Sequence, residues 1–390
     1  MELRQSIAPH FRLEETARSI MLSQLAAVAV LLSVAIAMYG FRALIMGFAG
    51  ACGAVLAELL WRYLAKQQPT ITDLSAVVTG LMIALLLPAN ASVLLPLFAA
   101  VFAIGVVKLP FGGFGRSPFN CAAAGYCFIA LVCAGGRSLY NRALLDIADR
   151  EIFDRLPQQF FTYVKGYITP FANITTSETE LCGLLSPPVL LRAGVDPDLS
   201  AVELLFGGMR GPMGCTIGLL LIACAVWLYL RRSIAWRASA AYCAAVIVIS
   251  FFAPWKSVSR TMSPVYDLLS GAVLFAAVFI FGDIFTAPHT RSGQLIYGIC
   301  GGILTIVLRR TGSIDCGEIF AALMMNACAS PIDRLVWSLR QRGYSLSGEW
   351  ARYKQRLRKA LRSQRGSFAD IDLDELDFSG KGGWDDDDKE

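Results

Sequence analysis

The chain has 390 residues, of which 55% are hydrophobic and only 17% are charged, with a formal net charge of +5. Soluble domains carry about 25% charged residues, so this composition excludes an ordinary soluble enzyme. The apolar residues come in blocks of about 20, the length that crosses a bilayer as a helix. We predict an all-α polytopic membrane protein, with membrane lipid and no nucleic acid among its partners.

Ten apolar segments follow one another along the chain. They cover residues 19–39, 42–65, 74–90, 92–109, 118–134, 214–230, 237–253, 266–283, 293–308 and 315–330. Each is long and apolar enough to be interpreted as a transmembrane helix. The segment ahead of them, "MELRQSIAPHFRLEETARS", is charged, which argues against a cleavable signal peptide.

Basic residues are distributed unevenly among the short loops and predict the orientation. They follow the even-numbered segments at Arg62 and Lys66, Lys108 and Arg116, 231–237 and Arg291, and they return in 338–365. Because short cytoplasmic loops are enriched in Lys and Arg, we expect both termini in the cytoplasm and the loop 135–213 outside. The pair Arg309 and Arg310 departs from this pattern.

The chain looks duplicated around its long polar loop. "DLSAVVTGLMIALLLPA" (73–89) and "DLLSGAVLFAAVFIFGD" (267–283) each open with Asp-Leu and small residues. Since five segments lie on either side of the loop, the two halves must be inserted in opposite senses. Inverted repeats of this kind build transporters and channels. A stand-alone solute channel or transporter is therefore one functional interpretation.

This duplication predicts four parts of the chain. They are a five-helix repeat at 1–134, an extracytoplasmic loop at 135–213, a second five-helix repeat at 214–337, and a cytoplasmic tail at 338–390 that is first basic and then acidic.

Charged residues inside apolar segments mark candidate positions on an ion pathway, because a charge at the bilayer centre is costly. The candidates are Glu58, Asp73 and Asp283. Glu58 has a local alternative, a pair with Arg62 four residues along a helix. Asp73 has one too, as a helix N-cap. Asp283 ends an apolar segment beside a glycine and ahead of Pro288, so it is the strongest candidate for an ion or cofactor contact.

A glycine turn precedes the fifth segment. The stretch "FGGFGRSPFN" (111–120) contains three glycines and leads into a helix that we expect to begin near Pro118, since proline suits the first helical turn. We expect this turn to enter the membrane and to bring Gly113 and Asn120 close to a cofactor or an ion.

The eleven cysteines and two histidines predict no metal site. There is no C-x-x-C, and most cysteines lie singly inside apolar segments, where a thiol packs as a small hydrophobic group. Zinc and iron–sulfur sites need clustered ligands. No residue is identified as catalytic.

Several segments together resemble a known family. They are "SIAPHFR", "PTITDLSAVVTGLMIALLLP", "KLPFGGFGRSPFNCAAAG", "LLSGAVLFAAVFIFGDIFTAP", "GQLIYGICGGILTIVLRR" and "AALMMNACASPIDRL", which occur in this order. The chain resembles the D subunit of the Rnf ion-translocating ferredoxin:NAD oxidoreductase and the related B subunit of the sodium-pumping NADH:quinone reductase.

The resemblance implies a multi-pass subunit of a prokaryotic plasma membrane, with two inverted five-helix repeats. It implies electron transfer between ferredoxin and NAD, coupled to sodium or proton movement, in a complex with the Rnf-type C, G, E, A and B subunits. The chain would then be part of a translocating oxidoreductase and not an enzyme alone. The resemblance also implies FMN on the outer loop and leaves room for a second, non-covalent flavin.

The family attaches this FMN through a phosphoester to the threonine of an Asp-x-x-Ser-Gly-Ala-Thr stretch. Here "ELCGLLSP" places Glu180 at the aspartate, Gly183 at the serine and Ser186 at the threonine. A serine supplies the same hydroxyl nucleophile, so the resemblance implies a degraded flavinylation site at Ser186. Leu184 and Leu185 are bulkier than the family's small pair, which leaves a second interpretation, a turn that has lost the cofactor in a flavin-free scaffold subunit.

Overall fold

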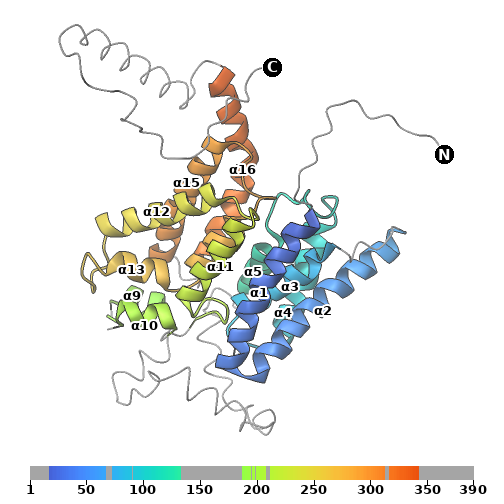
Figure 1. The fold of residues 1–390 in the computed structure, drawn as a ribbon, viewed down its shortest axis with the longest axis horizontal. Helices are drawn as coiled ribbons and strands as arrows, with labels where there is room; N and C mark the ends of the chain where they lie inside the picture. Colours follow the sequence, from blue (N-terminus) through green and yellow to red (C-terminus); the bar gives the residue numbers. More distant parts are fainter. Residues whose placement is uncertain are drawn as a thin grey trace, which may run out of the picture. The chain divides into compact units, whose positions relative to one another are not determined.

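The structure, a computed structural model, describes residues 17–66, 73–89, 91–132, 187–194, 196–197, 199–207, 211–311 and 316–341. Within these residues every regular element is a helix (Figure 1). Four helices are long and apolar enough to cross a membrane, or five if one bent pair counts as a span, and five further apolar helices are shorter. The prediction of an all-α polytopic membrane protein is confirmed, while a total of ten crossings stays a prediction.

The first set of helices follows the first five predicted segments. It comprises α1 (Ala17–Tyr39), α2 (Phe41–Leu64), α3 (Ser75–Leu86), α4 (Leu94–Phe102) with its π-helical continuation η2 (Ala103–Lys108), and α5 (Cys121–Val132). The crossing of α2 and α3 depends on Gly50 and Gly80, because a Cβ on either residue would overlap the backbone carbonyl of the other. Small residues of this kind let membrane helices approach closely.

The second set contains one span that is broken. It comprises α11 (Gly218–Leu230), α12 (Trp236–Phe252), the broken span, α15 (Arg291–Thr311) and α16 (Gly317–Gln341). The broken span consists of α13 (Ser263–Leu269), α14 (Val273–Phe275) and the π-helix η4 (Ala276–Ile280), with a bend of 61° between α13 and the rest. The single continuous span predicted over 266–283 is therefore wrong.

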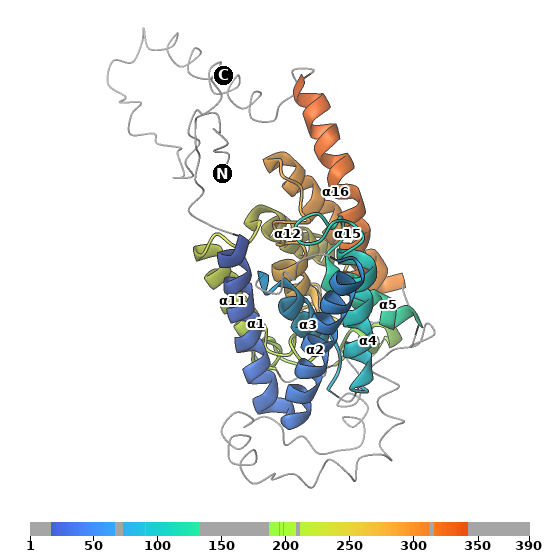
Figure 2. The ribbon, with the colours of Figure 1, turned by 90° about the vertical axis from the view of Figure 1, so that its right-hand side faces the viewer.

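The two sets share a packing plan. In each set the second helix packs on the third and the fourth, α2 on α3 and α4 and α12 on α13 and α15. The first helices, α1 and α11, pack on each other and run in opposite directions (Figure 1, Figure 2). This antiparallel relation of matching helices is the arrangement that inverted repeats produce, and it supports the duplication predicted from the sequence.

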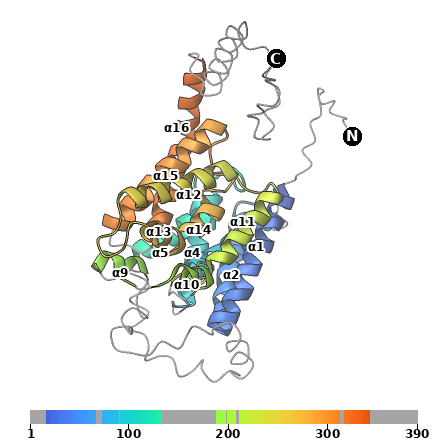
Figure 3. The ribbon, with the colours of Figure 1, turned by 60° about the vertical axis from the view of Figure 1, so that its left-hand side comes forward.

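Two short helices precede the second set. They are α9 (Pro187–Ala193), which lies beside α13 (Figure 3), and α10 (Ala201–Phe206). A capping box starts α10, because the Ser200 side chain accepts from the Glu203 N–H while the Glu203 carboxylate accepts from the Ser200 N–H. Glu180, Gly183 and Ser186 lie outside the described residues.

Aromatic packing holds the end of the broken span. The ring of Phe281 stacks on Tyr242 of α12 with centroids 4.1 Å apart and meets Tyr297 of α15 edge-on at 5.3 Å. The Tyr242 hydroxyl lies 3.1 Å from the Thr305 Oγ1. Because Phe281 is fixed between two helices, the backbone that leads to Asp283 is fixed as well.

The pair Arg309 and Arg310 departs from the basic-loop pattern because both side chains point into the protein. Arg309 is 1% exposed and donates to the Asp267 carbonyl and to the Ser270 Oγ. Arg310 forms an ion pair with the Asp267 carboxylate at 3.3 Å. These two arginines therefore report internal hydrogen bonding and not the side of the membrane.

Candidate functional site

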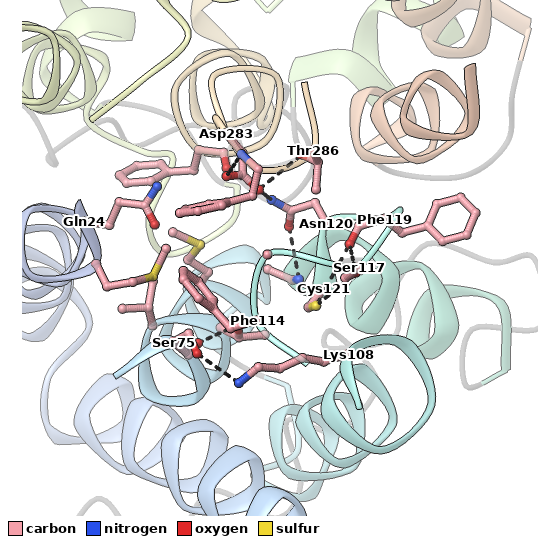
Figure 4. A pocket seen from close by; sticks show the side chains of 18 of the residues that line it. Gln24, Ser75, Lys108, Phe114, Ser117, Phe119, Asn120, Cys121, Asp283 and Thr286 are labelled. Atoms are coloured by element: carbon pink, nitrogen blue, oxygen red, sulfur yellow. Dashed lines mark hydrogen bonds between the residues drawn. The ribbon is translucent and has the colours of Figure 1, made fainter. Parts of the chain in front are cut away.

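A pocket lies between the two helix sets, where the glycine turn of the first meets the end of the broken span of the second (Figure 4). Its volume is about 70 Å³, and its polar lining includes Gln24, Ser75, Lys108, Asn120, Asp283 and Thr286. Figure 4 shows Asn120, Asp283 and Thr286 on one side, Ser75 and Lys108 on the other, and Phe114 between them. Since about 10–15 Å³ of such cavity space holds one water molecule, the pocket has room for a small cation with water.

Asn120 joins the two helix sets. Its Oδ1 accepts from the Ala122 and Ala123 N–H groups at 3.1 and 3.2 Å, so the side chain caps the start of α5. Its Nδ2 donates to the Phe279 carbonyl at 3.3 Å and to the Asp283 Oδ2 at 3.1 Å. The helix therefore begins at Cys121 and not near Pro118.

Asp283 is a buried carboxylate with only neutral partners. Its Oδ1 accepts from the Phe285 N–H, and its Oδ2 accepts from Thr286 and Asn120, all at 3.1 Å. The ion pairs of the described residues involve Glu58 and Asp267, and none reaches Asp283. Because a carboxylate has about four acceptor positions, about one remains for a cation or a proton.

The glycine turn forms part of the pocket wall. Gly112, Gly113 and Gly115 have φ values of 102°, 90° and 76°, a region that favours glycine. Gly113 is buried, lines the pocket, and donates its N–H to the Lys108 carbonyl at 3.0 Å. The structure thus brings together Gly113, Asn120 and Asp283, which the sequence marked separately as candidates. The depth of the glycine turn in the membrane stays a prediction.

Two π-helices end at the pocket. η2 ends at Lys108 and η4 contains Phe279, and both residues line the cavity. A π-helical turn rotates the residues that follow it relative to a regular α-helix, and such turns occur frequently at functional sites. One comes from each helix set, so both halves of the chain contribute irregular backbone to the same place.

A buried ion pair lies directly behind the pocket. The Lys108 Nζ donates to the Glu58 Oε2 at 2.8 Å and to the Ser75 Oγ at 2.9 Å. Arg62 lies 3.5 Å from Glu58, so the predicted local pair exists, but Glu58 is only 2% exposed and its shorter contact is with Lys108. The expectation that Lys108 is a cytoplasmic loop charge is wrong, because the side chain is 3% exposed.

The structure tests one of the two roles that the sequence predicts for Asp73, the helix cap, and its role on an ion pathway stays a prediction. Asp73 does not line the pocket. The N-cap of α3 is Leu74, without a side-chain hydrogen bond, so the interpretation of Asp73 as a helix cap is wrong.

The sequence gives no prediction for several polar lining residues, among them Gln24, Ser75, Lys108 and Thr286. Gln24 sits in a long apolar helix and is 4% exposed, which is a usable signal for a functional position. Thr286 is one helical turn beyond Asp283, so its proximity to that residue could also have been inferred.

The pocket offers oxygen ligands that suit a small cation. The Asp283 carboxylate and the Ser75 and Thr286 hydroxyls line it, and oxygens of these kinds are among the ligands of hard cations. The phenylalanines and the amide of the lining would also suit an isoalloxazine ring, so a second, non-covalent flavin stays a prediction. Among the described residues no three His, Cys, Asp or Glu side chains group as a metal site.

The sequence was compared with known proteins. A family model described as the NQR2, RnfD, RnfE family matches residues 4–341. The chain is 29% identical over 338 residues to the D subunit of the Na(+)-translocating ferredoxin:NAD(+) oxidoreductase complex of Acetobacterium woodii, covering 86% of this chain and 93% of that one. It is 28% identical over 360 residues to the D subunit of the ion-translocating oxidoreductase complex of Shewanella amazonensis, covering 89% and 99%. For the D subunit of the Escherichia coli complex the identity is 27% over 345 residues, with 85% and 96% covered.

Proposed function

Because the chain belongs to the NQR2, RnfD, RnfE family, we propose that it is the D subunit of an Rnf-type ion-translocating oxidoreductase. The relatives that carry this name match it over most of both lengths. In this role it would assemble with the C, G, E, A and B subunits in a prokaryotic plasma membrane, with both termini in the cytoplasm. It would help to couple electron transfer between ferredoxin and NAD to sodium or proton movement.

The observation that carries the ion-coupling role is the Asn120–Asp283 contact. It joins the two helix sets through a buried carboxylate that forms no ion pair among the described residues. A carboxylate in such a place is costly unless a cation or a proton neutralises it. We infer that the pocket takes up the coupling cation, with Asp283 supplying the charge. A scaffold that only holds a complex together has no need of this carboxylate.

The electron-carrying role rests on the outer loop. Ser186 would hold FMN through its hydroxyl, with Glu180 as the nearby carboxylate and Gly183 in the stretch between them. FMN held there would supply the redox chemistry, and the protein would supply its position. The alternative is a flavin-free scaffold subunit, in which this stretch is only a turn that has lost the cofactor.

One experiment separates these roles. The complex is purified with Asp283→Asn, with Ser186→Ala, or with the control Asp196→Asn, which changes an exposed carboxylate. Each is reconstituted in liposomes for ion uptake driven by electron transfer, and the intact mass of the chain is measured. We expect Asp283→Asn to abolish ion uptake and to keep the flavin mass. Ser186→Ala should lose one FMN less water.

Two results would contradict the proposal. Wild-type ion uptake in Asp283→Asn would remove the coupling role of the pocket. A chain mass that equals the polypeptide alone, in both the wild type and Ser186→Ala, would favour the flavin-free subunit. The control should match the wild type in both measurements.

A further inference from the structure

The helices α2 and α11 end in the same way. "WRYLAK" (61–66) and "WLYLRR" (227–232) share a tryptophan, a tyrosine two residues later, a leucine, and a final basic residue. The backbone also closes alike. The N–H groups at 65 and 66 donate to the carbonyls at 61 and 63, and those at 231 and 232 donate to the carbonyls at 227 and 229.

The final basic residue of each end has a backbone conformation that does not suit it. Lys66 has a φ of 52° and Arg232 a φ of 51°, both left-handed. Glycine is the usual residue at this position after a helix, because a Cβ is strained there. The backbone alone would favour glycine at both ends, so a basic side chain needs another reason.

The tryptophan, the tyrosine and the leucine after the tyrosine face outward at both ends. Trp61, Tyr63 and Leu64 are 39%, 81% and 70% exposed. In the second end Trp227, Tyr229 and Leu230 are 47%, 52% and 71% exposed. Large rings and leucines are thus presented to the surroundings at two helix ends, in the same order.

Arg62 pairs with Glu58, but the other basic side chains at the tips of the two ends form no ion pair in the described part of the chain. Lys66, Arg231 and Arg232 are exposed, and none of them takes part in an ion pair there. Their charges are therefore available to an external anion.

The second end also holds its arginines on aromatic rings. The Arg231 guanidinium lies 5.6 Å from the Trp227 ring centroid, and that of Arg237 lies 5.3 Å from Trp236. Tyr229 meets Trp236 edge-on at 6.1 Å, which links the two pairs. A guanidinium stacked on a ring keeps its in-plane N–H donors free for phosphate oxygens.

Both ends lie on the same side of the helices, together with the start of α1 (Figure 1). The basic-loop pattern predicts that this side is cytoplasmic. Tryptophan and tyrosine gather at membrane interfaces, and basic residues beside them are attracted to the anionic lipids of the cytoplasmic leaflet.

We propose that these two helix ends, residues 61–66 and 227–237, are matched anchors that bind the headgroups of anionic phospholipids. The exposed leucines and rings enter the boundary between headgroups and acyl chains, while the basic residues contact lipid phosphate. The proposal does not rest on the proposed function, because it needs neither flavin nor partner subunits. The second anchor, with its two arginine–tryptophan pairs, should bind more tightly than the first.

The test uses the full chain in bilayers of phosphatidylcholine alone or of phosphatidylcholine with phosphatidylglycerol. Native mass spectrometry counts the phosphatidylglycerol molecules retained per chain, and a titration gives their affinity. Each lost charge in Lys66→Gly, Arg232→Gly or Arg231→Gln should lower this affinity about fivefold. Added salt should weaken binding to the wild type and should have less effect on the variants.

The glycine variants separate lipid binding from folding. Because glycine suits a left-handed helix end, Lys66→Gly and Arg232→Gly should unfold at the same temperature as the wild type or higher in phosphatidylcholine alone. Arg260→Gln is the matched control, since Arg260 is exposed and lies 5.9 Å from the Phe251 ring at the other end of α12. It should retain phosphatidylglycerol as the wild type does.

Three results would overturn the proposal. The first is unchanged phosphatidylglycerol affinity in the double variant Lys66→Gly/Arg232→Gly. The second is an equal loss in Arg260→Gln, which would mean that any surface charge serves. The third is a double variant that binds lipid as the wild type does but fails to co-purify with other subunits. That result would assign the two ends to a protein partner.

Discussion

The two helix sets hold their third spans with buried cations, and they do so in different surroundings. In the first set Lys108, at the end of η2, donates to the Ser75 hydroxyl at the start of α3. In the second set Arg309, near the end of α15, donates to the Ser270 hydroxyl at the break between α13 and α14. In both sets the cation comes from the fourth span and reaches a serine of the third.

A left-handed residue lies next to each serine. Leu74 precedes Ser75 with a φ of 56°, and Gly271 follows Ser270 with a φ of 70°. The chain therefore turns sharply beside this serine in each set, before it in one and after it in the other, and the buried cation fixes the turn. The residue at the turn differs, a strained leucine in one set and an unstrained glycine in the other.

We call Lys108 with Ser75 and Glu58 the first cluster, and Arg309 with Ser270, Asp267 and Arg310 the second cluster. The surroundings of these two clusters differ more than their residues do. Lys108 and Ser75 line the pocket. The second cluster is covered by α9, where the Arg192 Nε donates to the Arg309 carbonyl at 2.7 Å, and Glu318 accepts from the Ala272 N–H. The stability of the first cluster therefore depends on balanced charge beside a cavity. The stability of the second cluster depends on close packing of the neighbouring residues around it.

The largest effect should come from unbalancing the first cluster. Glu58→Gln leaves the Lys108 ammonium, 3% exposed, without the carboxylate that neutralises it. Removing one partner of a buried pair costs about 3–5 kcal/mol. Thermal and denaturant unfolding of the purified chain in detergent would measure this loss.

Two matched variants test whether charge balance is the cause. The double variant Glu58→Gln/Lys108→Met should recover most of the lost stability, because a neutral pair of similar size is nearly as good as the ion pair. Asp267→Asn in the second cluster should cost less than Glu58→Gln, since its partner Arg310 is 22% exposed and can be hydrated. A double variant as unstable as the single one would contradict the charge argument.

A smaller loss should follow from filling the turn of the second cluster. In Gly271→Ala the new Cβ would lie 2.8 Å from the Glu318 Oε1, in a left-handed conformation. Strain and crowding together should cost about 2–4 kcal/mol, measured by the same unfolding experiments. Gly194→Ala is the control, because Gly194 has a φ of 79° but nothing within 4 Å of the added Cβ. It should show the conformational part alone, about 1–2 kcal/mol. Equal losses would show that Glu318 does not crowd the turn.

The positions of the helices could be predicted closely from the sequence. The first predicted segment, 19–39, corresponds to α1 (Ala17–Tyr39), and 214–230 corresponds to α11 (Gly218–Leu230). Long apolar blocks leave little choice, because a membrane span must satisfy its backbone internally. The break at Gly271 was missed, since a glycine in an apolar run does not reveal its φ angle or a 61° bend.

The site was predicted in part, for a physical reason. Gly113, Asn120 and Asp283 were each chosen as candidates because polar or flexible residues in apolar surroundings need a partner, but their contact was not predicted. Lys108 was misassigned because a rule based on loop position counts a charge without knowing where its side chain points. Its buried partner Glu58 lies 50 residues away in the chain, so no local pattern links the two.

The smallest effect should come from relaxing the turn of the first cluster. The informative result is which of two variants at Leu74 is the more stable. Leu74→Gly removes the left-handed strain of a non-glycine residue but also loses a half-buried side chain, so the net change should stay within about 1 kcal/mol.

Leu74→Ala loses the side chain and keeps the strain, so it should be less stable than Leu74→Gly. This order is the reverse of the usual helix preference for alanine over glycine. Unfolding of the two variants side by side would measure it. If alanine proved the more stable of the two, Leu74 would be an ordinary helical residue, and the likeness between the two turns would be lost. With glycine the more stable, both sets would have a left-handed turn beside the serine, and the clusters would differ in the residue at the turn and in their surroundings.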